Sequence, residues 1–165
     1  MAGAPCFIGI DLSSKIDLTA VVLVFPPTAA RLSWRLLPMC LTPEDTLDER
    51  EHRDRTPYRR WVSDGFLRTN PGKRIDQDVV RALVHDAAER YEVQQIGIDP
   101  WNAGNLVTDL VADGPQVVEI PQTLPQMTAP AKDFEADGLV DAGTTGCSSS
   151  PTRRGRACRR WYWSD

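Results

Sequence analysis

The chain has 165 residues and a net charge of −4, so it is long enough for one domain with a real core and has no overall basic character. Its four cysteines show neither a Cys-x-x-Cys pair nor a zinc spacing, and its N-terminus lacks the basic start of a signal peptide. The longest apolar stretch, 18–25, is too short to span a membrane. We therefore expect a soluble protein of a reducing, cytoplasmic compartment.

The first part of the chain predicts a meander of three strands, because short links join three apolar runs: 6–12, 18–25 and 31–41. The next stretch, 42–65, is densely charged with both signs and predicts helix. Thr42, followed by Pro43 and three residues on by Asp45, is typical of a helix start, and Pro57 would divide the stretch in two. Residues 66–74 predict a short extended piece and a turn.

The clearest predicted helix is 76–91, where apolar residues recur at helical spacing and Asp76 is a suitable N-cap. Strands and helices then alternate: strand 93–99, helix 102–112, strand 116–120 and helix 130–140. An alternating order calls for parallel pairing. The sequence thus predicts an α/β fold with a mixed sheet, three antiparallel strands followed by parallel ones, and helices on both faces.

One four-residue phrase occurs twice. Ile8-Gly9-Ile10-Asp11 and Ile96-Gly97-Ile98-Asp99 each place an aspartate at the end of an apolar strand. If the two strands are neighbours, both carboxylates project at the same edge of the sheet, where two anions repel unless a divalent cation bridges them. Mg²⁺ and Mn²⁺ suit such a site because they prefer carboxylate oxygen. Asp17, across the predicted hairpin turn, could join the cluster.

A structural role competes with metal binding at each of these positions. An aspartate at a strand end often caps the next turn, and Asp99 before Pro100 fits that role. The pair together with Asp17 favours metal. His52 and His85 have no partner at ligand spacing and are predicted to be solvated or core residues. Three tryptophans are interpreted as core or sheet-covering residues: Trp34, Trp61 and Trp101.

The order of several motifs resembles the C-terminal nuclease domain of the large terminase subunit of tailed bacteriophages. These motifs are Asp-Leu-Ser, Asp-Leu-Thr-Ala, Trp-Val-x-x-Gly, Pro-Gly-x-x-Ile-Asp and Asp-Pro-Trp-Asn-Ala, collinear over roughly residues 5–140. The resemblance implies a ribonuclease-H-like fold and a metal-dependent endonuclease that cuts concatemeric viral DNA during packaging. It implies two-metal hydrolysis with Mg²⁺ or Mn²⁺, and it assigns the metal-binding and catalytic carboxylates to Asp11, Asp17 and Asp99.

The resemblance also implies partners: double-stranded DNA, the small terminase subunit and the portal protein, in the cytoplasm of a bacterial host and without a membrane. Two departures from the family pattern accompany it. The family's packaging ATPase is not found in the sequence, and an Arg- and Ser-rich segment replaces the apolar one that carries a further metal-binding acid after residue 140. We therefore expect a nuclease domain over 1–143, truncated or frameshifted at its C-terminus, and a disordered or non-native tail over 144–165.

Three alternatives remain at this stage. A sugar-kinase-like ATPase fragment also begins with such a strand and hairpin, but Ser13-Ser14-Lys15 supplies no phosphate-binding glycine. A junction-resolving nuclease would share the metal site but not the Trp-Val-x-x-Gly and Pro-Gly motifs. An inactive prophage remnant, or a module that docks on DNA or portal without catalysis, would share the fold but not the chemistry.

Overall fold

The computed structural model describes residues 2–13, 18–29 and 32–136. The chain divides into two compact units, Met1–Gln122 and Thr123–Asp165. In order, the first contains β1 (Pro5–Asp11), β2 (Thr19–Phe25), β3 (Arg35–Pro43), α1 (Leu47–Asp54), α2 (Tyr58–Ser63), β4 (Leu67–Asn70), α3 (Gln77–Arg90), β5 (Glu92–Ile98), the 3₁₀ turn η1 (Pro100–Asn102), α4 (Asn105–Ala112) and β6 (Val117–Glu119). The second contains α5 (Leu124–Ala136). The predicted tail, 144–165, lies outside the described residues.

The strands form one six-stranded sheet in the order β4-β3-β2-β1-β5-β6. β1, β2 and β3 pair antiparallel, whereas β4 pairs parallel with β3, and β5 and β6 extend the sheet in parallel from β1. All strands except β2 therefore run in one direction, and their carboxyl ends share one edge of the sheet. This arrangement confirms the predicted α/β class and its ribonuclease-H-like sheet of antiparallel strands followed by parallel ones.

The central strands form because they alternate between buried and less buried residues. In β1 the buried positions are Cys6, Ile8 and Ile10, and in β2 every second residue from Thr19 to Phe25 is buried. Such a period of two places one set of side chains on one face of the sheet. That face forms the core of the unit, and burial raises the pKa of the Cys6 thiol to about 11.

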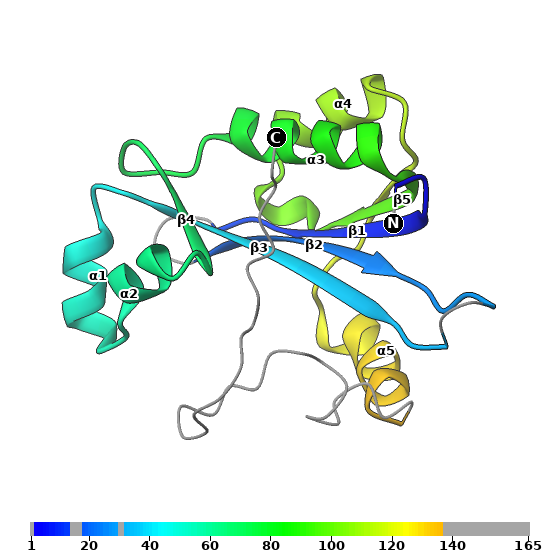
Figure 1. Ribbon diagram of the computed structural model, residues 1–165, viewed down its shortest axis with the longest axis horizontal. Coiled ribbons are helices and arrows are strands. Elements are labelled where there is room, and N and C mark those ends of the chain that lie inside the picture. The colour runs from blue at the N-terminus through cyan, green and yellow to red at the C-terminus, as the bar shows by residue number, and fades with distance from the viewer. Residues whose placement is uncertain (1, 14–17, 30–31, 137–165) are drawn as a thin grey trace. The chain divides into compact units, whose positions relative to one another are not determined.

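Helices α3 and α4 cover this buried face, as Figure 1 shows. Asp76 caps α3 as predicted, because its carboxylate accepts a hydrogen bond of 3.0 Å from the backbone N–H of Asp78. The two helices bury apolar stripes against the sheet: Val80, Leu83, Val84 and Ala87 from α3, and Leu106 and Leu110 from α4. Among the described residues, no helix has both the length and the apolar character needed to cross a bilayer.

A hairpin of α1 and α2 lies beside β4 (Figure 1) and encloses a buried arginine. Arg50 is only 2 % exposed, and its Nη1 donates a hydrogen bond of 2.5 Å to the hydroxyl of Thr42. Its guanidinium lies over the ring of Tyr58, 4.8 Å from the centroid. Within the described part of the chain, its Nε has no hydrogen-bond partner. A polar group buried in this way is costly unless its contacts compensate.

The structure corrects the predicted start of the first helix. Thr42 and Pro43 end β3, where they pair with Thr69 and Asn70, and α1 begins only at Leu47. Residues expected to be merely extended thus form β4, a fourth strand next to β3. The helix predicted over 130–140 begins earlier, at Leu124, and the residues after 136 lie outside the described ones.

One acidic side chain ties α3 to the end of α4. Asp113 accepts two hydrogen bonds from Arg81, of 2.7 and 2.8 Å, and lies 2.9 Å from Nε2 of His85. The Arg81 guanidinium, with a smaller contribution from His85, lowers the pKa of Asp113 from its ordinary value of 3.8 to about 2. His85, predicted to be solvated or core, is 53 % exposed in its side chain and belongs to this clamp.

We expect the Asp113 clamp to make stability depend on pH in acid. Since the pKa of Asp113 is lower in the folded chain, its ionised form stabilises the fold above pH 3.8, and this contribution is lost as the pH falls toward 2. Asp113→Asn should lower stability at neutral pH and flatten its decline between pH 4 and 2, as measured by urea unfolding at each pH. Parallel curves for both proteins over that range would contradict this role.

Candidate metal site at the carboxyl edge of the sheet

The repeated phrase occupies equivalent positions on two neighbouring strands. β1 and β5 pair in parallel with Ile8 opposite Ile96, Gly9 opposite Gly97 and Ile10 opposite Ile98. The four isoleucines of the two motifs are between 0 and 4 % exposed, so in both motifs the isoleucine side chains lie in the core. Asp11 ends β1 and Asp99 follows β5 directly. Because neighbouring strands lie about 4.8 Å apart, the two aspartates emerge side by side at the carboxyl edge of the sheet.

Hydrogen bonds fix the loops around these aspartates. After β1, the backbone N–H of Ser13 donates to the hydroxyl of the buried Thr19, at 3.0 Å. After β5, Asn102 Nδ2 donates to the carbonyl of Leu12, and Gln77 Nε2 donates to the carbonyl of Asn102, each at 3.3 Å. The amide of Asn102 thus links the loop after β5 to the loop after β1, and Gln77 links both to α3. Neither amide was predicted from the sequence to belong to the site.

Asp99 has the capping role that competed with metal binding in the sequence. Its Oδ1 accepts a hydrogen bond of 3.0 Å from the backbone N–H of Trp101, and it is the N-cap of η1. The cap also fixes the orientation of the Asp99 carboxylate. Capping and metal binding are therefore compatible, because a carboxylate has two oxygens and several acceptor sites.

The third predicted carboxylate, Asp17, lies outside the described residues, so its placement beside the pair stays a prediction. Within the described residues, no three His, Cys, Asp or Glu side chains gather into a group that could hold a metal ion. The donor chemistry of the pair nevertheless fits Mg²⁺ or Mn²⁺. Asp11 and Asp99 are carboxylates at the ends of two neighbouring strands, and these ions typically use one or two carboxylates and keep waters as their remaining ligands.

Trp101 differs from the prediction that the three tryptophans are core or sheet-covering residues. Trp101 is 86 % exposed, and Trp34 and Trp61 are 39 % and 37 % exposed. The residues around Trp101 make the contacts with the rest of the fold. Asp99 caps the turn, the side chain of Asn102 donates to the loop after β1, and Ala103 is buried, whereas the Trp101 side chain remains exposed. The interpretation of Trp101 as a core residue was wrong.

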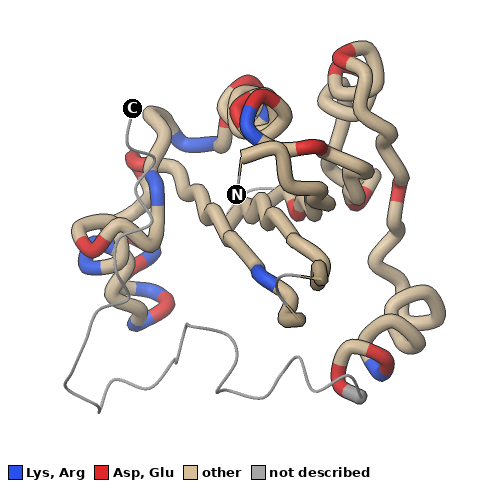
Figure 2. Tube along the Cα trace, turned by 45° about the vertical axis from the view of Figure 1, so that its right-hand side comes forward, with Lys and Arg blue, Asp and Glu red and all other residues tan. Residues whose placement is uncertain are grey.

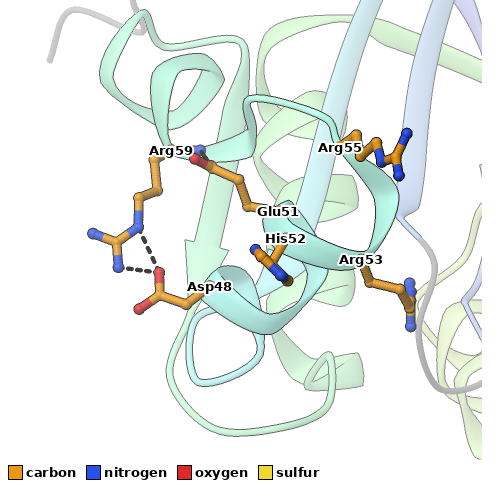
Figure 3. A pocket seen from close by; sticks show the side chains of 6 residues that line it. All are labelled: Asp48, Glu51, His52, Arg53, Arg55 and Arg59. Carbon is orange, nitrogen blue, oxygen red and sulfur yellow. Dashed lines mark hydrogen bonds and ion pairs between the residues drawn. The ribbon is translucent and has the colours of Figure 1, made fainter.

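A separate depression of about 670 Å³ lies on the α1–α2 hairpin, shown in Figure 3. Six charged or titratable side chains line it: Asp48, Glu51, His52, Arg53, Arg55 and Arg59. Arg59 pairs with Asp48, and Arg53 pairs with Asp54. Figure 2 shows charged residues of both signs gathered on these two helices, whereas the strands carry few. Because carboxylates pair with two of its three arginines, we assign no anion site here. His52 is exposed, in agreement with its prediction as a solvated or core residue.

The chain is similar to two known proteins. The chain is 35 % identical over 108 residues to the terminase large subunit of Enterobacteria phage HK97, which covers 66 % of this chain and 21 % of that protein. It is 25 % identical over 140 residues to protein YmfN of Escherichia coli (strain K12), covering 81 % of this chain and 31 % of YmfN. The chain thus spans less than a third of the length of these relatives.

A solved structure is also similar. The crystal structure of the HK97 bacteriophage large terminase matches with a TM-score of 0.69 and 31 % identity, over 82 % of this chain and 28 % of that one. The model of the family "Terminase large subunit, endonuclease domain" matches residues 1–143. These matches show that the chain belongs to the endonuclease-domain family of terminase large subunits, and its sheet order is consistent with that family.

Proposed function

We propose that this chain hydrolyses the phosphodiester backbone of viral DNA during genome packaging, as a metal-dependent endonuclease. The observation that carries the proposal is the alignment of the two Ile-Gly-Ile-Asp phrases, which brings Asp11 and Asp99 together where a parallel sheet typically holds its ligands. Family membership supports DNA as the substrate. It also favours this function over a sugar-kinase-like ATPase or a junction-resolving nuclease.

In this proposal Asp11 and Asp99, joined by Asp17, hold Mg²⁺ or Mn²⁺. When bound, such ions activate a water molecule and stabilise the leaving oxygen of the phosphodiester. The contribution of the chain is to keep the carboxylates in place. The N–H of Trp101 orients Asp99 and the Asn102 amide joins the two loops, so little rearrangement is needed when metal and substrate bind.

Basic residues at the same edge support binding to a phosphate backbone. Lys73 and Arg74 are exposed and follow β4, whose carboxyl end lies at the edge that carries Asp11. β4 is three strands from β1, so the two strands lie roughly 14 Å apart, at about 4.8 Å for each strand, and β4 ends three residues beyond the level of Asp11. A DNA duplex lying across the edge would reach both places. Contacts of this kind bind without regard to sequence and weaken as salt rises.

The proposal is tested with the 165-residue chain, supercoiled plasmid and Mn²⁺. We expect nicked and linear DNA with Mn²⁺ and intact plasmid with EDTA. At a hundredfold excess over its Kd, bound metal stabilises the fold by about 2.7 kcal/mol, which should raise the midpoint of thermal unfolding by roughly 5–10 °C. A folded chain that neither cuts DNA nor shifts with Mn²⁺ would support the alternative of an inactive remnant or docking module.

A further inference from the structure

Trp101 is unusual among the aromatic residues of the described chain because water surrounds most of it. It is 86 % exposed, whereas the next most exposed aromatic side chain, Phe66, is 54 % exposed. A ring of this size normally gains much of its stabilisation from burial and is usually well covered. An indole that forgoes this gain at the edge of a candidate active site suggests that a ligand covers it.

Hydrogen bonds fix the backbone that carries the exposed ring. The backbone N–H of Trp101 donates to Asp99 Oδ1 at 3.0 Å. In the next residue, Asn102, the side-chain amide donates to the carbonyl of Leu12 and the backbone carbonyl accepts from the side chain of Gln77. The backbone under the indole is thus tied to β1, β5 and α3 at once. A ring on such a base loses little conformational freedom when a ligand packs against it.

The position of Trp101 limits what that ligand can be. The backbone N–H of Trp101 donates to the carboxylate of Asp99, so the indole is carried by a residue next to the metal-site aspartates, and a phosphodiester bound at Asp11 and Asp99 would bring its neighbouring nucleotide close to it. Nucleotides present flat apolar base faces, and aromatic side chains bind these by stacking, whatever the sequence. The carboxylates cannot provide that contact, because they bind DNA only through metal and phosphate.

We propose that the indole of Trp101 stacks on an unstacked base next to the scissile phosphate and so positions that phosphate at Asp11 and Asp99. The proposal rests on the proposed function and adds to it a direct base contact from η1. It makes locally unstacked DNA, such as a duplex with an unpaired base, the preferred ligand. In an intact duplex the same contact requires one base step to unstack. Apolar side chains of other DNA-binding proteins unstack base steps in this way when they insert between them.

The test measures binding of a short labelled duplex with one unpaired base, by fluorescence anisotropy at low salt. It uses the full chain with Asp11→Asn, which should cut the DNA about 10³-fold more slowly than the parent and removes one repelling carboxylate. We expect Trp101→Ala to weaken binding roughly 5- to 150-fold, the range found for lost base stacking, and Trp101→Phe to weaken it less than about threefold. Thermal unfolding of each variant should match the parent, because the ring is exposed.

Phe66 provides a matched control. It is the other strongly exposed aromatic residue of the first unit and lies just before β4, three strands from β1 and therefore roughly 14 Å from Asp11 across the sheet, at about 4.8 Å for each strand. Phe66→Ala should leave DNA affinity unchanged. A parallel measurement follows the tryptophan emission lost in Trp101→Phe. Acrylamide should quench this emission in the free protein and quench it much less once the duplex is bound.

The outcomes separate this proposal from the proposed function. Equal DNA affinity of the parent and Trp101→Ala would overturn the stacking role and leave DNA as the substrate. Emission from Trp101 that is already shielded without DNA would also overturn it, because another part of the protein would then cover the ring. A parent chain that binds no DNA would reject both the substrate class and the contact.

Discussion

Asp11→Asn is expected to lower DNA cleavage by about 10³-fold and to abolish the stabilisation by Mn²⁺. A catalytic metal ion contributes several kcal/mol to the transition state, and each 1.36 kcal/mol corresponds to a factor of ten in rate. The substitution removes a charged ligand but keeps the size of the side chain. In the absence of metal, the variant should be at least as stable as the parent, because it relieves the repulsion between two neighbouring anions.

Asp99 allows its two roles to be separated. In Asp99→Asn the amide oxygen can still accept the N–H of Trp101, so the cap and the stability should persist while cleavage and the Mn²⁺ response are lost. Asp99→Ala loses the cap as well, and its free energy of unfolding should fall by about 1 kcal/mol. Plasmid cleavage and thermal unfolding with and without Mn²⁺ measure both effects.

Asp86→Asn is the matched control for both aspartates, because Asp86 is an exposed acid on α3 and lies outside the carboxyl-edge site. It should cut DNA and respond to Mn²⁺ as the parent does. Cleavage that survives in both Asp11→Asn and Asp99→Asn would show that these carboxylates are not the metal ligands. A response to Mn²⁺ lost equally in Asp86→Asn would point to a general effect of charge instead.

The sheet and the aspartate pair could be predicted because both follow from short-range patterns and general rules of topology. The meander follows from three apolar runs with short links, and parallel pairing of β5 follows from the helix that precedes it. Once those two strands are neighbours, the repeated phrase brings Asp11 and Asp99 to one edge. The position of Asp17 could not be tested, since it lies outside the described residues.

Other features depend on contacts that no spacing rule contains. Thr42 has the local pattern of a helix start, yet it ends β3, where it pairs with Thr69 and bonds to the buried Arg50. Gln77 and Asn102 meet across 25 residues of sequence. Tryptophan is buried in most proteins, so its type alone predicted a core or sheet-covering role for Trp101, and only the arrangement of η1 showed it exposed. Tertiary contacts decided each of these cases.

Arg50→Ala is expected to cause the largest loss of stability, about 3 kcal/mol, which is a large share of the total for a domain of this size. The substitution removes a side chain that is 2 % exposed, ends its contact with the ring of Tyr58 and leaves the buried Thr42 hydroxyl without its donor. Arg50→Lys keeps the charge but not the planar stacking, and should cost less. Urea unfolding measures both, provided that the slope m is unchanged.

A double substitution distinguishes a stabilising guanidinium from one that is merely tolerated. Arg50→Met and Thr42→Val should each lower the free energy of unfolding by about 1–2 kcal/mol, because each leaves a buried polar partner unpaired. Together they replace the pair with apolar groups, and the double variant should lose less than the sum, since such replacements are often nearly neutral. An Arg50→Ala variant as stable as the parent would show that the α1–α2 hairpin does not depend on this arginine, and simple additivity would show that Arg50 and Thr42 do not stabilise each other. The unpaired Nε favours a double variant that loses less than the sum, because part of the cost of burying Arg50 is not recovered within the described chain.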